Sequence, residues 1–161
     1  MTLSSASRYL QADRTPAKRN DALKFDYSQK VRGVNLGGWF VLEPWITPSI
    51  FEQLDDGDGV VDEWTYCQAL GPSKAYSLLS AHWNSWITED DFTQIAAAGL
   101  NHVRIPIGYW SVIPVSGEPF VQGAYDVLGQ ALDWAESAGL NVMIDLHGGK
   151  YIFFHHDTTG E

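Results

Sequence analysis

The residues best suited to chemistry stand at the ends of three apolar runs that are typical of β-strands. The first run is followed by Asn35, Trp39, Glu43 and Trp45, the second carries Arg104 and is followed by Tyr109 and Trp110, and the third ends in Asp145 and His147. In parallel α/β sheets, ligands bind at the carboxyl ends of the strands. A carboxylate, a guanidinium and an imidazole walled by aromatic rings would suit a polyhydroxylated ligand with apolar ring faces.

Each of these residues also has a structural interpretation. Arg104 could pair with a structural carboxylate such as Asp145, and Asp145 could instead cap a neighbouring element. His147 taken alone is more often a hydrogen-bonded core histidine than a catalyst. The functional interpretation therefore depends on the combination of residues at one end of the sheet and not on any one of them.

The elements that must position these residues include a repeat. The tetrapeptide Ala98-Gly99-Leu100-Asn101 recurs 40 positions later at residues 138–141. Each copy follows an amphipathic helical pattern and precedes an apolar strand, predicted at 103–107 and 142–146. Both glycines stand where a left-handed helix cap is required. Strands that alternate with helices in this way predict a parallel sheet, either open and doubly wound or closed into a barrel.

The two predicted helices of this repeat have distinct patterns. The first begins at Thr88, with Asp91 three residues later as in a capping box, and the second carries apolar residues at helical spacing over 121–135. Before them, residues 1–29 are predicted as an irregular lead-in and Lys30–Leu36 as a strand. Residues 39–62 are predicted as a long loop. Two helices are expected over 63–70 and 73–83, broken at Pro72, with Cys67 as a small buried residue.

Composition narrows the possible partners. The chain has 161 residues, 45% of them hydrophobic, and a net charge of −10, which argues against nucleic acid or an anionic membrane surface as a partner. Its one cysteine excludes an intrachain disulfide. No apolar run reaches transmembrane length, and the first 25 residues lack the apolar core of a signal peptide.

Nucleotide and metal sites are less favoured by the sequence. The glycines of residues 31–39 do not match the dinucleotide fingerprint, although an open α/β nucleotide-binding domain stays an alternative. The acidic stretch 55–59 fails the EF-hand register, because Val60 falls where a ligand should be. The residues His155-His156-Asp157 lack the rest of a metal site. We therefore expect neither a metal nor a cofactor.

Five longer motifs resemble a known family. V-R-G-V-N-L-G-G-W-F-V-L-E-P-W-I-T-P-S-I-F (31–51), D-E-W-T-Y-C-Q-A-L-G (62–71), H-W-N-S-W-I-T-E-D-D-F (82–92), G-L-N-H-V-R-I-P-I-G-Y-W (99–110) and I-D-L-H-G (144–148) are similar to segments of fungal exo-β-1,3-glucanases (glucan 1,3-β-glucosidases) of glycoside hydrolase family 5. The resemblance implies an α/β fold, with residues 30–148 as the N-terminal part, about three βα units, of a (β/α)₈ TIM barrel. It also implies release of glucose from β-1,3-glucan with retention of configuration.

The resemblance assigns roles to four residues in this sequence. Glu43 would bind the sugar at the cleavage subsite, and Trp45 would lie beside it where relatives can have tyrosine. Arg104 would support the nucleophile, and His147 would line the same subsite. Trp39, Tyr109 and Trp110 are candidates for an aromatic wall. The resemblance also implies a monomeric, extracellular or cell-wall full-length protein that acts on a β-glucan or oligosaccharide.

The two catalytic carboxylates of the family are missing from this sequence. The acid–base glutamate belongs to an N-E-P motif after the fourth strand and the nucleophile follows the seventh strand, but no N-E-P occurs among the 161 residues. A whole barrel takes ~250 residues. We therefore expect an incomplete, poorly stable barrel without hydrolytic activity, or alternatively a non-catalytic glucan-binding fragment.

The tail 149–161 departs from the family pattern. After His147-Gly148 the relatives continue with a glycine-rich loop, whereas here Gly149-Lys150-Tyr151 and an apolar run follow. Gly-Lys-Tyr can be encoded by GGTAAGTAT, which contains a fungal intron donor sequence. The tail is therefore interpreted as read-through of an unspliced intron or a mispredicted gene end, which the genomic DNA would decide.

Overall fold

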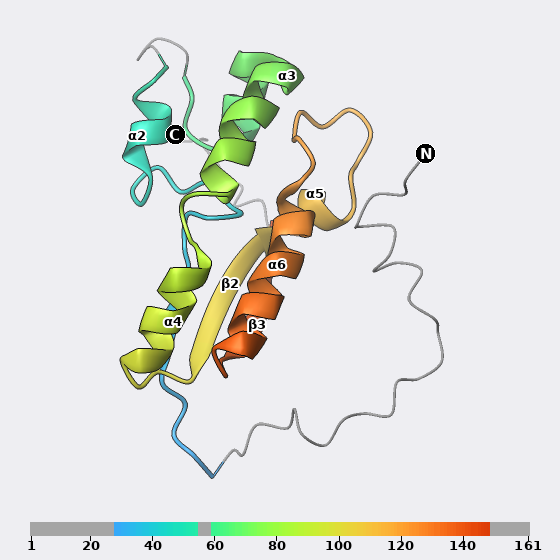
Figure 1. The fold of residues 1–161 in the computed structure, drawn as a ribbon. Coiled ribbons are helices and arrows are strands. Elements are labelled where there is room, and N and C mark those ends of the chain that lie inside the picture. The colour runs from blue at the N-terminus through green and yellow to red at the C-terminus, as the bar shows by residue number, and fades with distance from the viewer. Residues whose placement is uncertain (1–27, 55–58, 149–161) are drawn as a thin grey trace, which may run out of the picture.

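The computed structural model describes residues 28–54 and 59–148. Figure 1 shows the order of its elements: β1 (Gly33–Asn35), α2 (Pro48–Phe51), α3 (Glu63–Trp83), α4 (Glu89–Ala97), β2 (His102–Gly108), α5 (Tyr109–Val112), α6 (Ala124–Ser137) and β3 (Asn141–His147). The predicted tail, the His155-His156-Asp157 stretch and nearly all of the predicted lead-in and of the acidic stretch lie outside the described residues.

The three strands form one parallel sheet in the order β1-β2-β3. In its register, Asn35 stands opposite Arg104, and Gly108 stands opposite His147. This confirms the predicted parallel sheet with intervening helices. The first strand is shorter than predicted, because only Gly33–Asn35 of the run 30–36 pairs as a strand.

The repeated glycines end their helices as predicted. Gly99 has φ +81° and Gly139 has φ +71°, a backbone region that L side chains rarely adopt. Thr88 and Asp91 form the predicted capping box, with the Thr88 amide donating to Asp91 Oδ2 at 2.8 Å. The second helix begins at Ala124, three residues later than predicted.

The asparagine of each repeat fixes the start of its strand against the preceding one. Asn141 Nδ2 donates to the Asn101 carbonyl at 3.0 Å, and Asn101 Nδ2 donates to the Lys30 carbonyl at 3.1 Å. An asparagine side chain thus makes the same hydrogen bond to the preceding segment at the start of β2 and at the start of β3. These bonds set the register that places the strand-end residues of β2 and β3.

The predicted break between two helices is a kink within α3. Gly71 has φ +70° and ψ 165° immediately before Pro72, so the helical geometry is interrupted there. Cys67 is buried on α3, as expected. The loop predicted over 39–62 contains a one-turn helix, α2, which begins at Pro48. Such a short helix has no periodic pattern by which the sequence could predict it.

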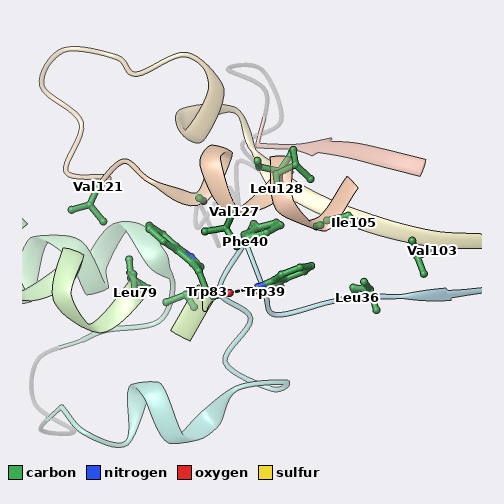
Figure 2. Close-up of a cluster of buried hydrophobic side chains, with 14 of the residues drawn as sticks. Leu36, Trp39, Phe40, Leu79, Trp83, Val103, Ile105, Val121, Val127 and Leu128 are labelled. Carbon is green, nitrogen blue, oxygen red and sulfur yellow. Dashed lines mark hydrogen bonds between the residues drawn. The ribbon is translucent and has the colours of Figure 1, made fainter. Parts of the chain in front are cut away.

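Helices α4 and α6 lie along one face of the sheet, and α3 lies beyond the ends of the strands and contacts α6 (Figure 1). All three helices contribute buried side chains to the core. Val103, Ile105 and Ile107 of β2 are buried on this face. Figure 2 shows Trp39 and Phe40 packed among side chains from α3, α6 and β2. Trp39 is fully buried, stacks on Phe40 with ring centroids 4.1 Å apart, and donates through Nε1 to the Trp83 carbonyl at 2.8 Å.

Strand β3 is less covered than β2. Met143, Ile144 and Leu146 are each more than half exposed. Among the residues that the structure describes, no helix combines the length and the apolar character needed to span a membrane.

Candidate functional site: a polar cluster at the carboxyl ends of the strands

Four of the polar residues considered from the sequence meet on the sheet face opposite the helices. Because paired residues of parallel strands point to the same face, Asn35 and Arg104 share it, and Asp145 and His147 share it two residues apart on β3. Arg104 Nη1 donates to Asn35 Oδ1 at 2.5 Å, and Arg104 Nη2 donates to Asp145 Oδ2. The guanidinium therefore connects all three strands.

His147 completes this cluster. Its Nε2 lies 2.5 Å from Asp145 Oδ2 and 3.1 Å from Arg104 Nη2. The Asp145 oxygen thus accepts from Arg104, and from the imidazole when Nε2 carries the proton. The side chains of Arg104, Asp145 and His147 are each exposed by about a third, so a ligand can reach the group. The pairing of Arg104 with Asp145 considered from the sequence is present, and it lies within the candidate site.

Glu43 is held beside this cluster by its loop. Its Oε2 accepts the Gly38 amide at 3.1 Å, and its carbonyl accepts the amides of Ile46 and Thr47 at 2.8 and 2.9 Å. A Cβ on Gly37 would lie 3.0 Å from both Glu43 Oε2 and Asn35 Nδ2. Glu43 and Asn35 therefore adjoin the same glycine, and a side chain at this position would push against both of them.

The turn that carries these glycines is anchored by the end of α3. His82 Nε2 donates to the Gly38 carbonyl at 2.7 Å, and Trp86 Nε1 donates to the Gly37 carbonyl at 3.1 Å. Burial lowers the pKa of His82, which keeps the ring neutral with its proton on Nε2 for this bond. The helix thus fixes the backbone to which the Glu43 carboxylate is bound.

The three candidate wall residues and Trp45 have different surroundings. Trp45 is 77% exposed and free to stack on a ligand ring, whereas Trp39 is fully buried in the core. The assignment of Trp39 to an aromatic wall is therefore wrong for this structure, because its ring packs between the sheet and the helices. Trp110 is also buried, and it stacks on Phe120 with centroids 4.1 Å apart and an interplanar angle of 6°.

Tyr109 is half-buried and lines a small cavity. Its hydroxyl donates to Glu118 Oε1 at 2.7 Å, and burial together with this carboxylate raises the pKa of Tyr109 to about 12. The cavity has a volume of about 160 Å³ and is lined by Val41, Leu42, Asp62, Glu63, Trp64, Tyr109, Trp110, Phe120 and Gly148. Four of these nine residues are aromatic, and the cavity lies next to the ends of β2 and β3.

Glu63 is a buried carboxyl that the sequence did not single out. It is 4% exposed at the start of α3, and burial is the main cause that raises its pKa to about 7. Its Oε2 accepts the Leu42 amide at 3.0 Å and its Oε1 accepts Trp110 Nε1 at 2.9 Å. Its sequence context, one acidic residue after the helix N-cap Asp62, is too common to indicate such a role.

The cluster can bind a ligand rich in hydroxyl groups. Carboxylates of Glu43 and Asp145 accept hydrogen bonds, Arg104 donates them, and Trp45 offers an apolar ring face. Among the described ranges 28–54 and 59–148, no group of three or more His, Cys, Asp or Glu side chains is placed to hold a metal ion.

Known proteins share both the sequence and the fold of this chain. The chain is 59% identical over 127 residues to a glucan 1,3-beta-glucosidase of Blumeria graminis, covering 78% of this chain and 30% of that protein. It is 55% identical over 149 residues to a probable glucan 1,3-beta-glucosidase A of Aspergillus niger, covering 92% and 35%. The chain thus spans about a third of the length of these curated relatives.

Two solved structures resemble the fold of this chain. A rutinosidase from Aspergillus niger superposes with a TM-score of 0.65 at 29% identity, over 72% of this chain and 32% of that one. A second structure, described as AoRut, has a TM-score of 0.65 at 31% identity, over 76% and 34%. The described sheet and helices are therefore part of a (β/α)₈ barrel, which decides between the two architectures that the repeat left open.

A model of one glycosidase family matches more than half of the chain. It is described as cellulase (glycosyl hydrolase family 5) and matches residues 67–161, a range that includes Arg104, Asp145 and His147. The match agrees with the motifs, with the barrel architecture and with a polar cluster suited to sugars. On these grounds the chain belongs to glycosyl hydrolase family 5.

Proposed function

We propose that this chain forms the sugar-binding part of a retaining glucan 1,3-β-glucosidase. The observation that carries the proposal is the contact of Asn35, Arg104, Asp145 and His147 on one face of the sheet, with Glu43 beside them. The names of the relatives from Blumeria graminis and Aspergillus niger support β-1,3-glucan as the substrate.

Glu43 and Trp45 would hold the glucose unit that is cleaved from the chain end. The Glu43 carboxylate accepts hydroxyl protons of the sugar, and the exposed Trp45 ring covers an apolar sugar face. His147 contributes a further polar contact in the same subsite. Such contacts accelerate the reaction only where they bind the distorted ring of the transition state more tightly than the relaxed sugar.

Arg104 would act on the nucleophile. A retaining glycosidase uses a carboxylate nucleophile and a carboxylic acid–base about 5 Å apart. A guanidinium beside the nucleophile favours its ionised form. The two contacts of Arg104 with Asn35 and Asp145 fix the guanidinium plane, which supports this positioning role. Both catalytic glutamates would come from later βα units, so we propose that the 161 residues alone release no glucose.

A second candidate function is glucan binding without hydrolysis. It is favoured by the position of the proposed sugar contacts Glu43, Trp45, Arg104 and His147, all of which lie within the described residues. Within either function, we propose residues 1–29 as a lead-in and 30–148 as the barrel region. We also propose that the tail 149–161 departs from the family's residue pattern, although the match to the family model extends to residue 161. Secretion to the cell exterior or wall, and a monomeric full-length protein, also stay proposals.

A hybrid enzyme would test the proposal. Residues 30–148 of this chain would replace the aligned segment of the Aspergillus niger relative, which supplies the remaining βα units. The hybrid is expected to release glucose from laminarin with retention of configuration, whereas the 161-residue chain is not. A folded hybrid that binds laminarin but releases no glucose would support binding without hydrolysis and contradict the glucosidase.

A further inference from the structure

Glu63 contacts two segments that carry the candidate site, although it lies outside the site. Its two carboxyl oxygens accept separate donors, the Leu42 amide at 3.0 Å and the Trp110 indole at 2.9 Å. Leu42 belongs to the loop after β1, and Trp110 belongs to α5 after β2. The carboxyl thus bridges two loops that are joined through 67 intervening residues of chain.

The contact with Leu42 acts directly on Glu43. Leu42 is buried and precedes Glu43, so the bond to Glu63 fixes the peptide from which the Glu43 side chain emerges. On the other side of Glu43, its carbonyl accepts the Ile46 and Thr47 amides. Hydrogen bonds therefore fix the backbone on both sides of Glu43, and the one at Leu42 is made by a side chain of α3, Glu63.

The contact with Trp110 acts on the ends of β2 and β3. A Cβ on Gly108 would lie 2.2 Å from the Trp110 ring, and one on Gly148 would lie 2.8 Å from it. The indole therefore lies directly against the backbone at both strand ends, and Gly148 follows His147. Phe120 stacks on the Trp110 ring. The orientation of the indole, which the bond to Glu63 fixes, thus determines where the end of β3 can lie.

The chemistry of Glu63 fits this bridging role better than a space-filling role. Each oxygen of Glu63 accepts one of the two N–H donors, whereas a glutamine at this position would offer a single acceptor oxygen and bring its own NH₂ group against one of the donors. Burial raises the pKa of Glu63 to about 7, and such a desolvation cost is not required of a residue that merely fills the core. Helix capping does not require Glu63 either, because Asp62 Oδ1 accepts the Thr65 amide at 2.8 Å.

We propose that Glu63 is a positioning residue, which sets the geometry of Glu43 and His147 by joining Leu42 to Trp110. This inference rests on the proposed sugar-binding function of Glu43 and His147. Glu63 itself would not touch the sugar, since it is only 4% exposed. The ligand whose binding it would tune is a β-1,3-linked glucose oligomer.

Nuclear magnetic resonance of the ¹⁵N-labelled 161-residue chain tests the proposal. Two reporters are used, the Gly38 amide that donates to Glu43 and the His147 ring. Glu63→Gln is expected to change the chemical shifts of both reporters. It is also expected to weaken laminaritriose binding roughly tenfold, as for one lost hydrogen bond. Asp62→Ala is the matched control, because it removes the cap of the same helix and leaves the contacts with Leu42 and Trp110.

The proposal is overturned if Glu63→Gln leaves Gly38 and His147 unshifted, or if Asp62→Ala shifts them equally. Should Glu63→Gln fail to fold, Trp110→Phe removes the indole N–H together with part of the ring, and it is expected to change the His147 signals while the Gly38 signal stays unchanged. An unshifted His147 in that variant contradicts the proposal as well. If wild type does not bind laminaritriose, the sugar-binding function fails, and the two reporters still decide whether Glu63 positions these groups.

Discussion

Arg104 on β2 donates through Nη2 to Asp145 Oδ2 on β3, and this contact crosses the pair of strands whose ends carry the candidate site. The same Asp145 oxygen also lies 2.5 Å from Nε2 of His147, which stands two residues further along β3. One carboxylate therefore orients both the guanidinium and the imidazole. A charge-assisted network of this kind has a fixed geometry even though its side chains are about one-third exposed.

Replacing Arg104 by lysine should therefore lower activity more than the small change in side-chain size suggests. A single ammonium cannot reproduce the planar pair of contacts that Arg104 makes with Asn35 and Asp145. In the hybrid enzyme we expect kcat/KM on laminarin to fall roughly a hundredfold. The matched control is Arg32→Lys, at an exposed arginine outside the cluster, which should leave kcat/KM unchanged. Equal rates for both variants would refute this role for Arg104.

Gly37→Ala should damage the site more than the fold. The added Cβ would lie 2.9 Å from Ile46 Cδ1 and 3.0 Å from Glu43 Oε2 and Asn35 Nδ2. Because all three are side-chain atoms that can move slightly, the free energy of unfolding should fall by only about 1 kcal/mol. Laminarin turnover by the hybrid should fall at least tenfold, since Glu43 must shift.

The double variant Gly37→Ala, Ile46→Val identifies the cause of that loss. Valine removes the Ile46 Cδ1 atom and so relieves one of the close contacts, while those with Glu43 and Asn35 stay. Turnover should therefore stay low in the double variant while the free energy of unfolding recovers. Recovery of turnover would mean that displacement of Ile46, and not of the polar side chains, caused the loss.

The two tryptophans Trp39 and Trp45 should respond in opposite ways to alanine. Trp39 is fully buried and bonded to the Trp83 carbonyl, so Trp39→Ala should lower the free energy of unfolding by about 3–5 kcal/mol. Trp45 is 77% exposed, so Trp45→Ala should change stability by less than about 0.5 kcal/mol and weaken laminaritriose binding. Urea unfolding and calorimetric titration measure the two effects. Unchanged laminaritriose affinity in Trp45→Ala would exclude the proposed stacking.

Glu63 should give the free energy of unfolding a specific pH dependence. Its pKa rises from 4.5 to about 7 on folding, mainly through burial, so the folded state binds a proton that the unfolded state has released between these values. The contribution of Glu63 to stability therefore falls as pH increases from about 4.5 to 7, by up to about 3 kcal/mol. Of its titratable neighbours, Asp62 adds to the shift, and Cys67, with a pKa of about 12, does not titrate there.

Urea unfolding of wild type and Glu63→Gln at several pH values measures this contribution. The stability of wild type relative to the variant should decrease between pH 4.5 and 7 and then level off. Parallel profiles would show that Glu63 does not change its protonation on folding in this range.

Local patterns predicted the parts of the fold that local physics decides. The glycines at 99 and 139 and the capping box at Thr88 follow from backbone geometry, and the structure has them. The repeat predicted where Arg104 and His147 stand in their strands, because β2 begins at His102, directly after Asn101, and β3 begins at Asn141. Arg104 is the third residue of β2 and His147 is the last residue of β3. The strand pattern therefore sufficed to place both residues on one face of the sheet.

Tertiary packing decided what the sequence alone could not. Trp39 and Trp45 are two positions of the same loop, and only the path of the chain after β1 buries one and exposes the other. Glu63 resembles any acidic residue in a first helical turn, until α5 brings the Trp110 indole against it. Such roles arise from contacts between segments that are distant in sequence, which no local pattern contains.

Binding of laminaritriose to the 161-residue chain tests most directly whether this cluster holds a β-1,3-glucan sugar. Titration calorimetry would compare wild type with Glu43→Gln, which keeps the shape of the side chain and removes its charge. Loss of a hydrogen bond to a charged group predicts a dissociation constant raised roughly ten- to a hundredfold in the variant. Equal affinity of the two proteins, or no binding by wild type, would contradict the account.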